Sequence, residues 1–265
     1  MAAYAAVGGL LILLWLVYRY SLFVPAPKGL PILMYHNVSL SSNDRLTISV
    51  DQLDRQLRYI KAQGYTPISF PELEDSLAGV RALPEKPVLI TFDDGYASAR
   101  ELAVPVLQKH GCKATVFLPT AYLDGMNTWD GGNERVMSRE EIREMAGPLV
   151  DFGLHSYSHE SYQSYSSAQV ETDVSRCVSA LEESHCPFVR VFAYPYGRTP
   201  DDAGADRAMR DTFRRHGIHF AVRIGSRINT LPPKDPYQLR RTGVNGTDPF
   251  FEFKIKLRKG RSKLF

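Results

Sequence analysis

Short apolar runs alternate with longer amphipathic segments along most of the chain. Runs such as 88–92 and 152–154 are apolar and stop at polar or turn residues, which predicts buried strands. The segments between such runs carry apolar residues at helical spacing, which predicts helices over 50–63, 96–110, 138–145, 167–184 and 203–217. The helix over 96–110 is expected to break or kink near Pro105. This alternation of strands and helices is typical of an α/β fold built as a parallel barrel.

The first 24 residues do not show this alternation of short apolar runs and amphipathic segments. Residues 1–18 carry no charged side chain, and Arg19 can extend its charged group towards an interface, so the apolar stretch is about long enough to span a bilayer. It has no basic leading region and no clear cleavage site, which favours an uncleaved anchor over a signal peptide. We predict one amino-terminal transmembrane helix over 1–24, a linker over 25–29 and a folded domain over 30–248. The alternative for the first segment is a buried helix of the domain.

Composition and charge set broad limits. The chain has 265 residues, of which 44% are hydrophobic and 23% charged, as expected for one barrel-sized globular domain. Residues 249–265 mix Lys and Arg with apolar side chains, which predicts a basic amphipathic tail. That tail could lie on an anionic membrane surface or be solvated. The net charge is only +3 and no nucleic-acid-binding module is recognised, so we expect no nucleic-acid partner.

Acidic residues and histidines end two of the predicted strands. Asp93 and Asp94 follow the run 88–92, and His155 and His159 follow the run 152–154. A spacing of four places both imidazoles on one side if a helical turn follows the strand. Together these residues offer ligands for a divalent metal and one spare carboxylate for proton chemistry, which indicates a metal-assisted hydrolase. Taken alone, an Asp-Asp-Gly sequence is ordinary turn chemistry, and a lone histidine pair is more often a surface coincidence.

Two further apolar runs stop at polar or turn residues. The run over 191–194 ends at Pro195, Tyr196 and Gly197, and the run over 30–35 ends at His36. Strand ends of this kind carry the functional loops of α/β barrels. By itself His36 is more often a structural residue than a catalyst. The His-x-x-x-His spacing lacks the glutamate of a zinc-protease helix, so we exclude a metalloprotease.

These four segments together resemble the polysaccharide deacetylase family, also called the NodB-homology or carbohydrate esterase family 4 domain. The resemblance covers about 30–244 and rests on Thr-Phe-Asp-Asp-Gly at 91–95, His-Ser-x-x-His at 155–159 and Leu-Met-Tyr-His at 33–36. It implies a distorted, incomplete (β/α) barrel. It also implies a metal-dependent hydrolase that removes N-acetyl groups from an amino-sugar polysaccharide, with an N-acylated amino-sugar glycan as partner.

The resemblance also implies a role for each matching residue. Asp93 would be the general base, and Asp94, His155 and His159 would bind the metal. That ligand set suits Zn²⁺, with Co²⁺, Ni²⁺ or Fe²⁺ as alternatives. The backbone N–H of Tyr196 would stabilise the tetrahedral oxyanion.

Two departures from the family pattern are visible. The third family motif places an arginine where this chain has Ala193, and Arg241 could supply that charge from another strand. The usual carboxy-terminal Leu-x-His is missing. The biofilm poly-N-acetylglucosamine deacetylase branch carries the corresponding histidine near the amino terminus, and His36 fits that position. His36 would then protonate the leaving amine.

Aromatic residues near the motifs suggest a sugar groove. Trp129 lies in a polar, glycine-rich loop and Tyr157 lies between the two histidines, so we expect both rings to contact substrate. We also expect Pro195, which follows a strand, to contact substrate. Core packing is the alternative for each of them.

Two other functions stay open at this point. A lipid-linked amino-sugar deformylase would fit a cytoplasmic domain and the basic tail. A catalytically weak glycan-binding scaffold is supported only by Ala193. We expect a single-pass membrane protein whose domain is extracytoplasmic, although the basic residues after the span favour the cytoplasmic side.

Overall fold

Seven parallel strands close into a barrel in the computed structural model, which describes residues 2–20, 23, 25–41 and 44–262. The ring order is β1-β10-β9-β8-β7-β6-β5, and β1 pairs back with β5 to close it. The strands are β1 (Ile32–Tyr35), β5 (Pro87–Phe92), β6 (Ala114–Leu118), β7 (Val150–Leu154), β8 (Val191–Ala193), β9 (Phe220–Ile224) and β10 (Leu239–Gly243). The predicted incomplete barrel is confirmed, since the ring has seven strands rather than eight.

Shorter strands flank the ring. The two-residue strand β4 (Thr66–Pro67) pairs with β5 outside the ring. β2 (Asn37–Ser39) and β3 (Thr47–Ser49) form a separate parallel pair directly after β1. This pair extends the chain beyond the carboxyl end of β1, where functional residues gather in barrels.

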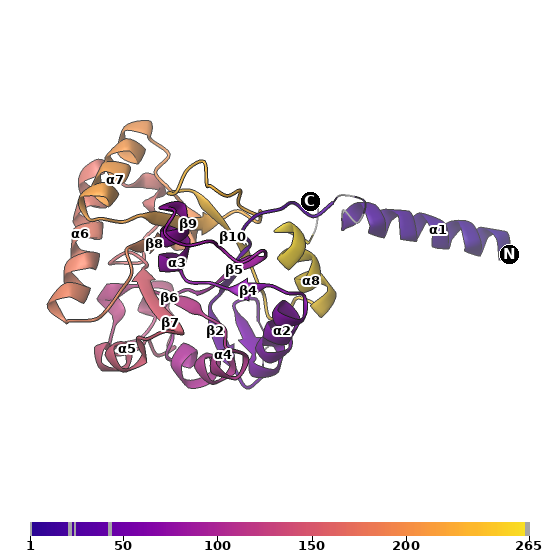
Figure 1. The fold of residues 1–265 in the computed structure, drawn as a ribbon, viewed down its shortest axis with the longest axis horizontal. Coiled ribbons are helices and arrows are strands. Elements are labelled where there is room, and N and C mark those ends of the chain that lie inside the picture. Colours follow the sequence, from indigo (N-terminus) through magenta and orange to yellow (C-terminus); the bar gives the residue numbers. More distant parts are fainter. Residues whose placement is uncertain (1, 21–22, 24, 42–43, 263–265) are drawn as a thin grey trace.

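Helices surround the barrel (Figure 1). They are α2 (Val50–Ala62), α3 (Phe70–Leu77), α4 (Val104–His110), α5 (Arg139–Met145), α6 (Ser167–Glu183) and α7 (Ala203–Arg215). Serine begins four of them in a capping box with a Gln or Glu three residues later, as at Ser138 and Glu141 before α5. The break predicted near Pro105 in the helix over 96–110 is confirmed, and a π-helical turn (Ala99–Ala103) precedes α4. Pro105 explains the break, because it has no N–H for the helical ladder.

Alternate strand residues form two separate cores. Leu89 belongs to the cluster inside the barrel, whereas its neighbour Ile90 belongs to the layer between strands and helices. Phe70 of α3 closes the amino-terminal end of the barrel, with its ring centroid 6.2 Å from that of Phe117 and 6.1 Å from that of Phe220. Polar residues lie at the opposite, carboxyl end of the barrel.

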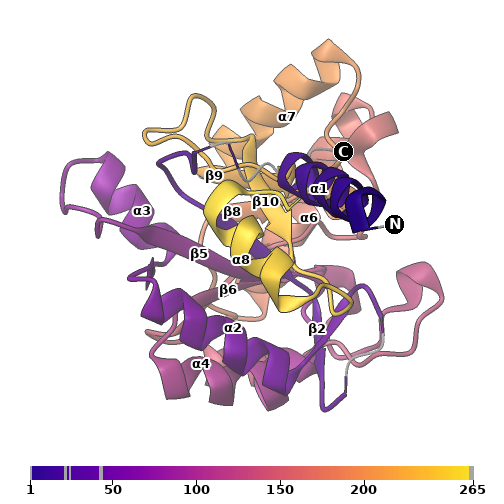
Figure 2. The same ribbon diagram turned by 90° about the vertical axis from the view of Figure 1, so that its right-hand side faces the viewer.

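The basic segment near the carboxyl terminus packs on the domain. Helix α8 (Phe250–Lys259) lies beside α2 (Figure 2), and its Phe253 and Leu257 are fully buried in the outer core. Lys256 is also buried, and its Nζ donates to the carbonyl oxygen of Gly243 at 2.8 Å. As far as residue 262, the predicted amphipathic tail is therefore part of the folded domain.

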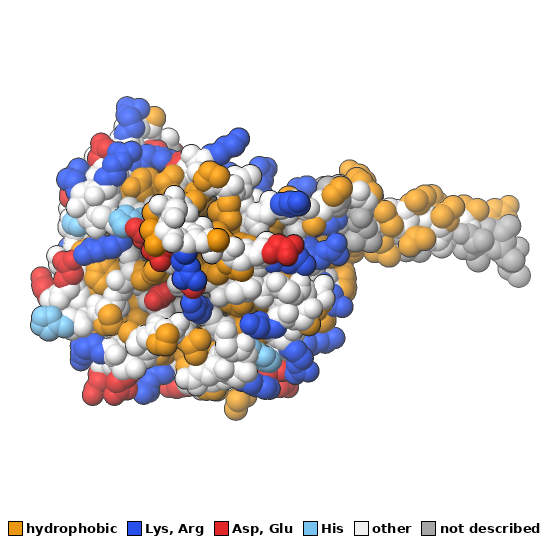
Figure 3. Space-filling view, viewed as in Figure 1, with side chains coloured by type: hydrophobic (Ala, Val, Ile, Leu, Met, Phe, Trp, Pro, Cys, Tyr) orange, Lys and Arg blue, Asp and Glu red, His pale blue; other side chains and the backbone are white. Residues whose placement is uncertain are grey.

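Helix α1 (Ala2–Arg19) projects away from the barrel, and apolar side chains cover much of its surface (Figure 3). Leu11 and Trp15 are among its exposed side chains. Within the described residues, no helix is both long and apolar enough to cross a membrane, so the transmembrane helix predicted over 1–24 is not supported. The 18 residues of α1 rise about 27 Å, slightly less than the roughly 30 Å of bilayer hydrocarbon. Residues 1, 21, 22 and 24 of that prediction lie outside the described residues.

Candidate active site and metal centre

The carboxyl ends of four strands place the candidate residues at one end of the barrel. Asp93 and Asp94 follow β5, His155 follows β7, His36 follows β1, and Arg241 lies within β10. The carboxyl ends of parallel strands in a closed barrel converge, so residues far apart in the sequence become neighbours. This convergence brings together the acidic and histidine motifs.

Asp94, His155 and His159 form a compact, buried cluster. One ligand atom from each residue lies within 4.8 Å of the others. Oδ1 of Asp94 is 3.3 Å from Nε2 of His155 and 3.1 Å from Nε2 of His159. Burial alone would raise the pKa of Asp94, but its contacts with the two histidines outweigh burial and hold that pKa well below the usual range. The carboxylate is therefore ionised and available as a ligand at neutral pH.

The hydrogen bonds around His155 fit a bound cation. Its Nδ1 lies 2.8 Å from the carbonyl oxygen of Ala193, which can only accept, so a neutral ring carries its proton on Nδ1. Nε2 then directs a lone pair at the carboxylate of Asp94, and a cation between these two acceptors would satisfy both. Burial lowers the pKa of His155, but the negative charges of Asp93 and Asp94 outweigh burial and the net shift is upward. The surroundings of His155 therefore favour a positive charge at this position. One oxygen and two nitrogen donors suit a divalent metal such as zinc.

Asp93 pairs with Arg241 across the barrel interior. Nη1 and Nη2 of Arg241 donate to the two carboxylate oxygens at 2.5 and 2.6 Å, and both side chains are almost fully buried. Burial would raise the pKa of Asp93, but Arg241 and His155 outweigh it, and the pKa lies below its usual value. Arg241 thus supplies, from β10, a charge beside the acidic motif that Ala193 cannot supply.

Small residues on neighbouring strands leave room for this arginine. Ala193 belongs to the cluster inside the barrel, and the guanidinium of Arg241 lies 5.4 Å from the ring centroid of Phe117. A Cβ at Gly153 would come within 2.6 Å of the Phe117 ring, so this position requires glycine. The large arginine and phenylalanine side chains are therefore accommodated by small residues on β7 and β8.

A cavity of about 930 Å³ opens over the cluster. It is lined by eight of the predicted site residues: His36, Asp93, Asp94, Trp129, His155, His159, Tyr196 and Arg241. A cavity of this size can hold a sugar together with part of a neighbouring unit. The structure therefore brings the predicted base, acid and metal ligands to one solvent-accessible space.

Aromatic rings form one wall of this cavity. The ring centroid of Trp129 lies 4.5 Å from that of His159 and 4.8 Å from that of Tyr122, and Tyr196 lies 5.1 Å from His159. Tyr196 is 53% exposed. Exposed rings beside a polar centre suit the apolar faces of a sugar.

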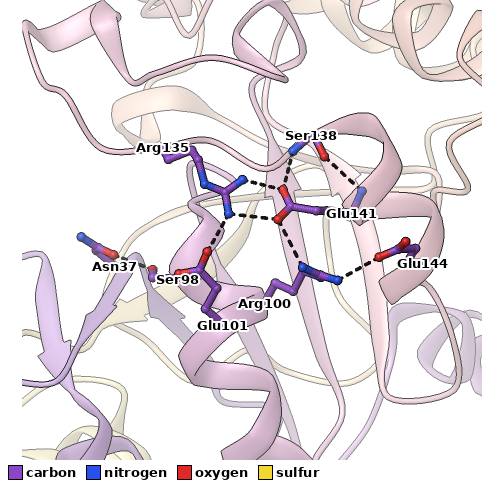
Figure 4. A network of polar contacts seen from close by, with 8 residues as sticks. All are labelled: Asn37, Ser98, Arg100, Glu101, Arg135, Ser138, Glu141 and Glu144. Carbon is purple, nitrogen blue, oxygen red and sulfur yellow. Dashed lines mark hydrogen bonds and ion pairs between the residues drawn. The ribbon is translucent and has the colours of Figure 1, made fainter.

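A polar network holds the loop that carries Trp129 (Figure 4). Arg135 donates to Glu141 of α5 at 2.7 Å and to Glu101 of the π-helical turn at 2.6 Å. The backbone N–H of Met137 donates to the carbonyl oxygen of Gly95 at 2.9 Å. The aromatic wall is thus tied directly to the turn that carries the two aspartates.

Two predicted substrate residues lie elsewhere. Tyr157 does not line the cavity; it borders a separate surface depression, where the guanidinium of Arg176 lies 3.8 Å from its ring centroid. Pro195 is buried and also lies outside the cavity lining. The expected helical turn after His155 is absent, and left-handed backbone at Ser156 (φ 62°) precedes Tyr157 in an irregular loop.

One functional candidate was missed from the sequence. Buried Asp173 of α6 accepts from the backbone N–H groups of Tyr157 and Ser158 at 3.0 and 3.1 Å, and from the hydroxyls of Ser158 and Tyr162 at 2.8 and 2.6 Å. It therefore fixes the loop between the two histidines. The available signal was an acidic residue on the apolar face of a helix, three residues after Val170.

The comparisons with known proteins agree with this geometry. A family model described as polysaccharide deacetylase matches residues 81–221. The chain is 28% identical over 172 residues to YxkH of Bacillus subtilis (strain 168), named as a polysaccharide deacetylase, covering 65% of this chain and 58% of that protein. It is 28% identical over 182 residues to the poly-beta-1,6-N-acetyl-D-glucosamine N-deacetylase of Staphylococcus epidermidis, covering 65% and 59%. The chain thus spans less than two thirds of the length of these two relatives.

Solved structures show the same fold. IcaB from Ammonifex degensii is 30% identical with a TM-score of 0.69, and the match covers 88% of this chain and 97% of that chain. The deacetylase PplD from Streptococcus pyogenes, in complex with acetate, is 24% identical with a TM-score of 0.69, covering 83% and 94%. The second match supports the fold alone.

Proposed function

The chain belongs to the polysaccharide deacetylase family, and we propose that it is a metal-dependent hydrolase that removes N-acetyl groups from a polymer of N-acetylglucosamine. The observation that carries this proposal is the buried set of Asp94, His155 and His159 beside the Asp93–Arg241 pair, all on one cavity. The relatives named as poly-beta-1,6-N-acetyl-D-glucosamine N-deacetylases support the choice of polymer.

The three buried ligands would hold the metal. A divalent ion bound by Asp94, His155 and His159, which we propose is Zn²⁺, would supply Lewis acidity to water and to the amide carbonyl oxygen. Asp94 provides the negative charge, and the hydrogen bond to Ala193 fixes the ring of His155 with Nε2 free to coordinate.

Asp93 is the proposed general base. It accepts a proton from the water that attacks the amide carbon, while Arg241 fixes both carboxylate oxygens and keeps the residue ionised until then. The backbone N–H of Tyr196 is the proposed hydrogen-bond donor to the oxyanion that forms on the carbonyl oxygen. Left-handed backbone at Tyr196 (φ 55°) sets the direction of this loop.

His36 is the proposed general acid. It lines the cavity from the carboxyl end of β1 and donates a proton to the amine nitrogen as the C–N bond breaks. The products are acetate and the free amino sugar. Trp129 stacks on the sugar from the aromatic wall.

A catalytically weak scaffold is the less favoured function. Its only support was Ala193, which stands where the family motif has an arginine. Arg241 pairs with Asp93 and supplies that charge from β10, so this support is removed. A binding protein also has no need of a buried carboxylate–arginine pair beside a metal-ligand set.

Acetate release tests the proposal. The full chain, loaded with Zn²⁺, is incubated with N-acetylglucosamine oligomers before and after chelation, and acetate is measured. We expect release that stops on chelation and returns with metal. Asp93→Asn is the matched variant, expected to keep its metal and lose turnover. Turnover that persists in Asp93→Asn, or that is insensitive to chelation, would overturn the mechanism.

A further inference from the structure

Three cations line the cavity over the proposed metal site besides the residues assigned to catalysis, and Asp130 also lines it. Arg45 follows the β2 strand, Lys256 lies on α8, and Arg261 follows α8, and all three line the same cavity as Asp93 and His155. None of these three cations has a part in the proposed chemistry. Arg45 is more than 200 residues from the other two in the sequence.

Two of these three cations form no ion pair among the described residues. Lys256 has an ion pair with Asp248 at 2.5 Å and donates to the backbone at Gly243, so it serves the fold. Arg45 and Arg261 are exposed and, within the part of the chain that the structure describes, neither lies within 4.0 Å of a carboxylate. An arginine that supports the fold would have such partners, as Arg241 does. These two guanidinium groups are therefore free to bind a ligand.

We propose that Arg45 and Arg261 bind, within this cavity, a phosphate or diphosphate group carried by the amino-sugar substrate, an inference that rests on the proposed function. Guanidinium groups match phosphate oxygens in pairs of hydrogen bonds. A phosphate ester carries about −1.5 to −2 charges near pH 7, which balances two free arginines. A cavity of about 930 Å³ can hold both the reacting sugar and this group.

The charge of the two arginines also bears on how the substrate is oriented. An anionic phosphate on the glycan is attracted to Arg45 and Arg261. The sugar is thereby oriented with its acetamide towards Asp93 and its phosphate towards the arginines.

Binding in the absence of metal tests the site separately from catalysis. The chelator-treated full chain is titrated calorimetrically with N-acetylglucosamine 1-phosphate and with N-acetylglucosamine at low salt, so that no bound metal can ligate the phosphate. We expect the phosphorylated sugar to bind at least about tenfold more tightly. Arg45→Gln/Arg261→Gln should remove that preference. Arg207→Gln/Lys234→Gln is the matched control, because it changes the net charge equally at exposed positions outside the cavity.

The outcomes separate the two proposals. Equal affinity of the wild type and Arg45→Gln/Arg261→Gln for the phosphorylated sugar would overturn the phosphate site. Arginine-dependent binding without acetate release from any metal-loaded reaction would support the phosphate site and overturn the proposed function. In active enzyme, kcat/KM for the soluble sugar phosphate is compared with that for a polyprenyl-diphosphate N-acetylglucosamine in vesicles. The substrate with the higher kcat/KM identifies the source of the phosphate. Its kcat/KM should fall at least about tenfold in Arg45→Gln/Arg261→Gln.

Discussion

Replacing Arg241 with glutamine would remove the partner of a buried carboxylate. In the structure both oxygens of Asp93 accept from the guanidinium at 2.5 and 2.6 Å, and the two side chains are 1% and 4% exposed. Water can therefore reach Asp93 only from the cavity side and replaces the lost donors only in part. Breaking a buried pair from one side costs about 3–5 kcal/mol. Two hydrogen bonds to a charged group, at about 1.5–3 kcal/mol each, give a similar figure.

The size of the defect should depend on pH. In the wild type the pKa of Asp93 is lowered, so the pair contributes stability above the ordinary aspartate pKa of about 3.9 and loses it as the pH falls through the folded-state pKa. In Arg241→Gln, burial dominates and the pKa of Asp93 rises. That variant keeps its stability at low pH, where Asp93 is protonated, and loses it as the pH rises. The deficit of the variant is therefore largest at neutral pH and shrinks towards pH 4.

Urea unfolding of the chelator-treated protein measures this defect without metal binding. At pH 7 we expect Arg241→Gln to lose about 4 kcal/mol, or roughly 10 °C in Tm. Adding Asp93→Asn should restore much of the loss, because no uncompensated charge remains. Arg214→Gln is the matched control, since Arg214 pairs with Asp211 at an exposed site and its loss should cost less than about 1 kcal/mol. A loss under about 1 kcal/mol in Arg241→Gln, or a double variant no more stable than the single one, would refute this reasoning.

Three other substitutions test separate parts of the site. Asp173→Asn should weaken Zn²⁺ binding by about 10–100-fold, because the loop between the histidines loses acceptors; competition with a chromogenic chelator measures this, and wild-type affinity would contradict it. His36→Gln should lower kcat for acetate release by about 10²–10⁴-fold with metal content unchanged, whereas an unaltered kcat would exclude His36 as the acid. Trp129→Ala should raise KM for N-acetylglucosamine oligomers by about 3–10-fold with a smaller effect on kcat, and an unchanged KM would show that the ring does not contact substrate.

The positions of the site residues along the strands could be predicted from the sequence. Apolar runs that end in Asp93, His155 and His36 place these side chains at the carboxyl end of a barrel, where convergence follows from strand closure. Arg241 could be proposed because Ala193 left the base without a charged partner. Whether Arg241 reaches Asp93 depends on strand register, however, and no local sequence pattern sets the position of β10 relative to β5.

The conformation of the loops could not be predicted in the same way. The spacing of His155 and His159 suggested a helical turn, yet the two rings meet because of an irregular loop held by Asp173 from a different helix. For the same reason Tyr157 points away from the cavity. The break in the helix over 96–110 was indicated by Pro105, but the π-helical turn before it was not, since it depends on packing against the rest of the fold.

Backbone strain explains why the conformations of these loops could not be predicted from the sequence. Asp94, Ser156, His159 and Tyr196 all have left-handed backbone, with φ between 55° and 71°, although none is glycine. Each such residue costs about 1–3 kcal/mol, so local preference opposes the observed structure. The surrounding contacts must therefore impose this left-handed backbone. One such contact is the hydrogen bond that the backbone N–H of His159 donates to the hydroxyl oxygen of Ser156, at 2.8 Å. Two proposed metal ligands thus sit on strained backbone, so the barrel and the helices that support these loops determine the geometry of the site.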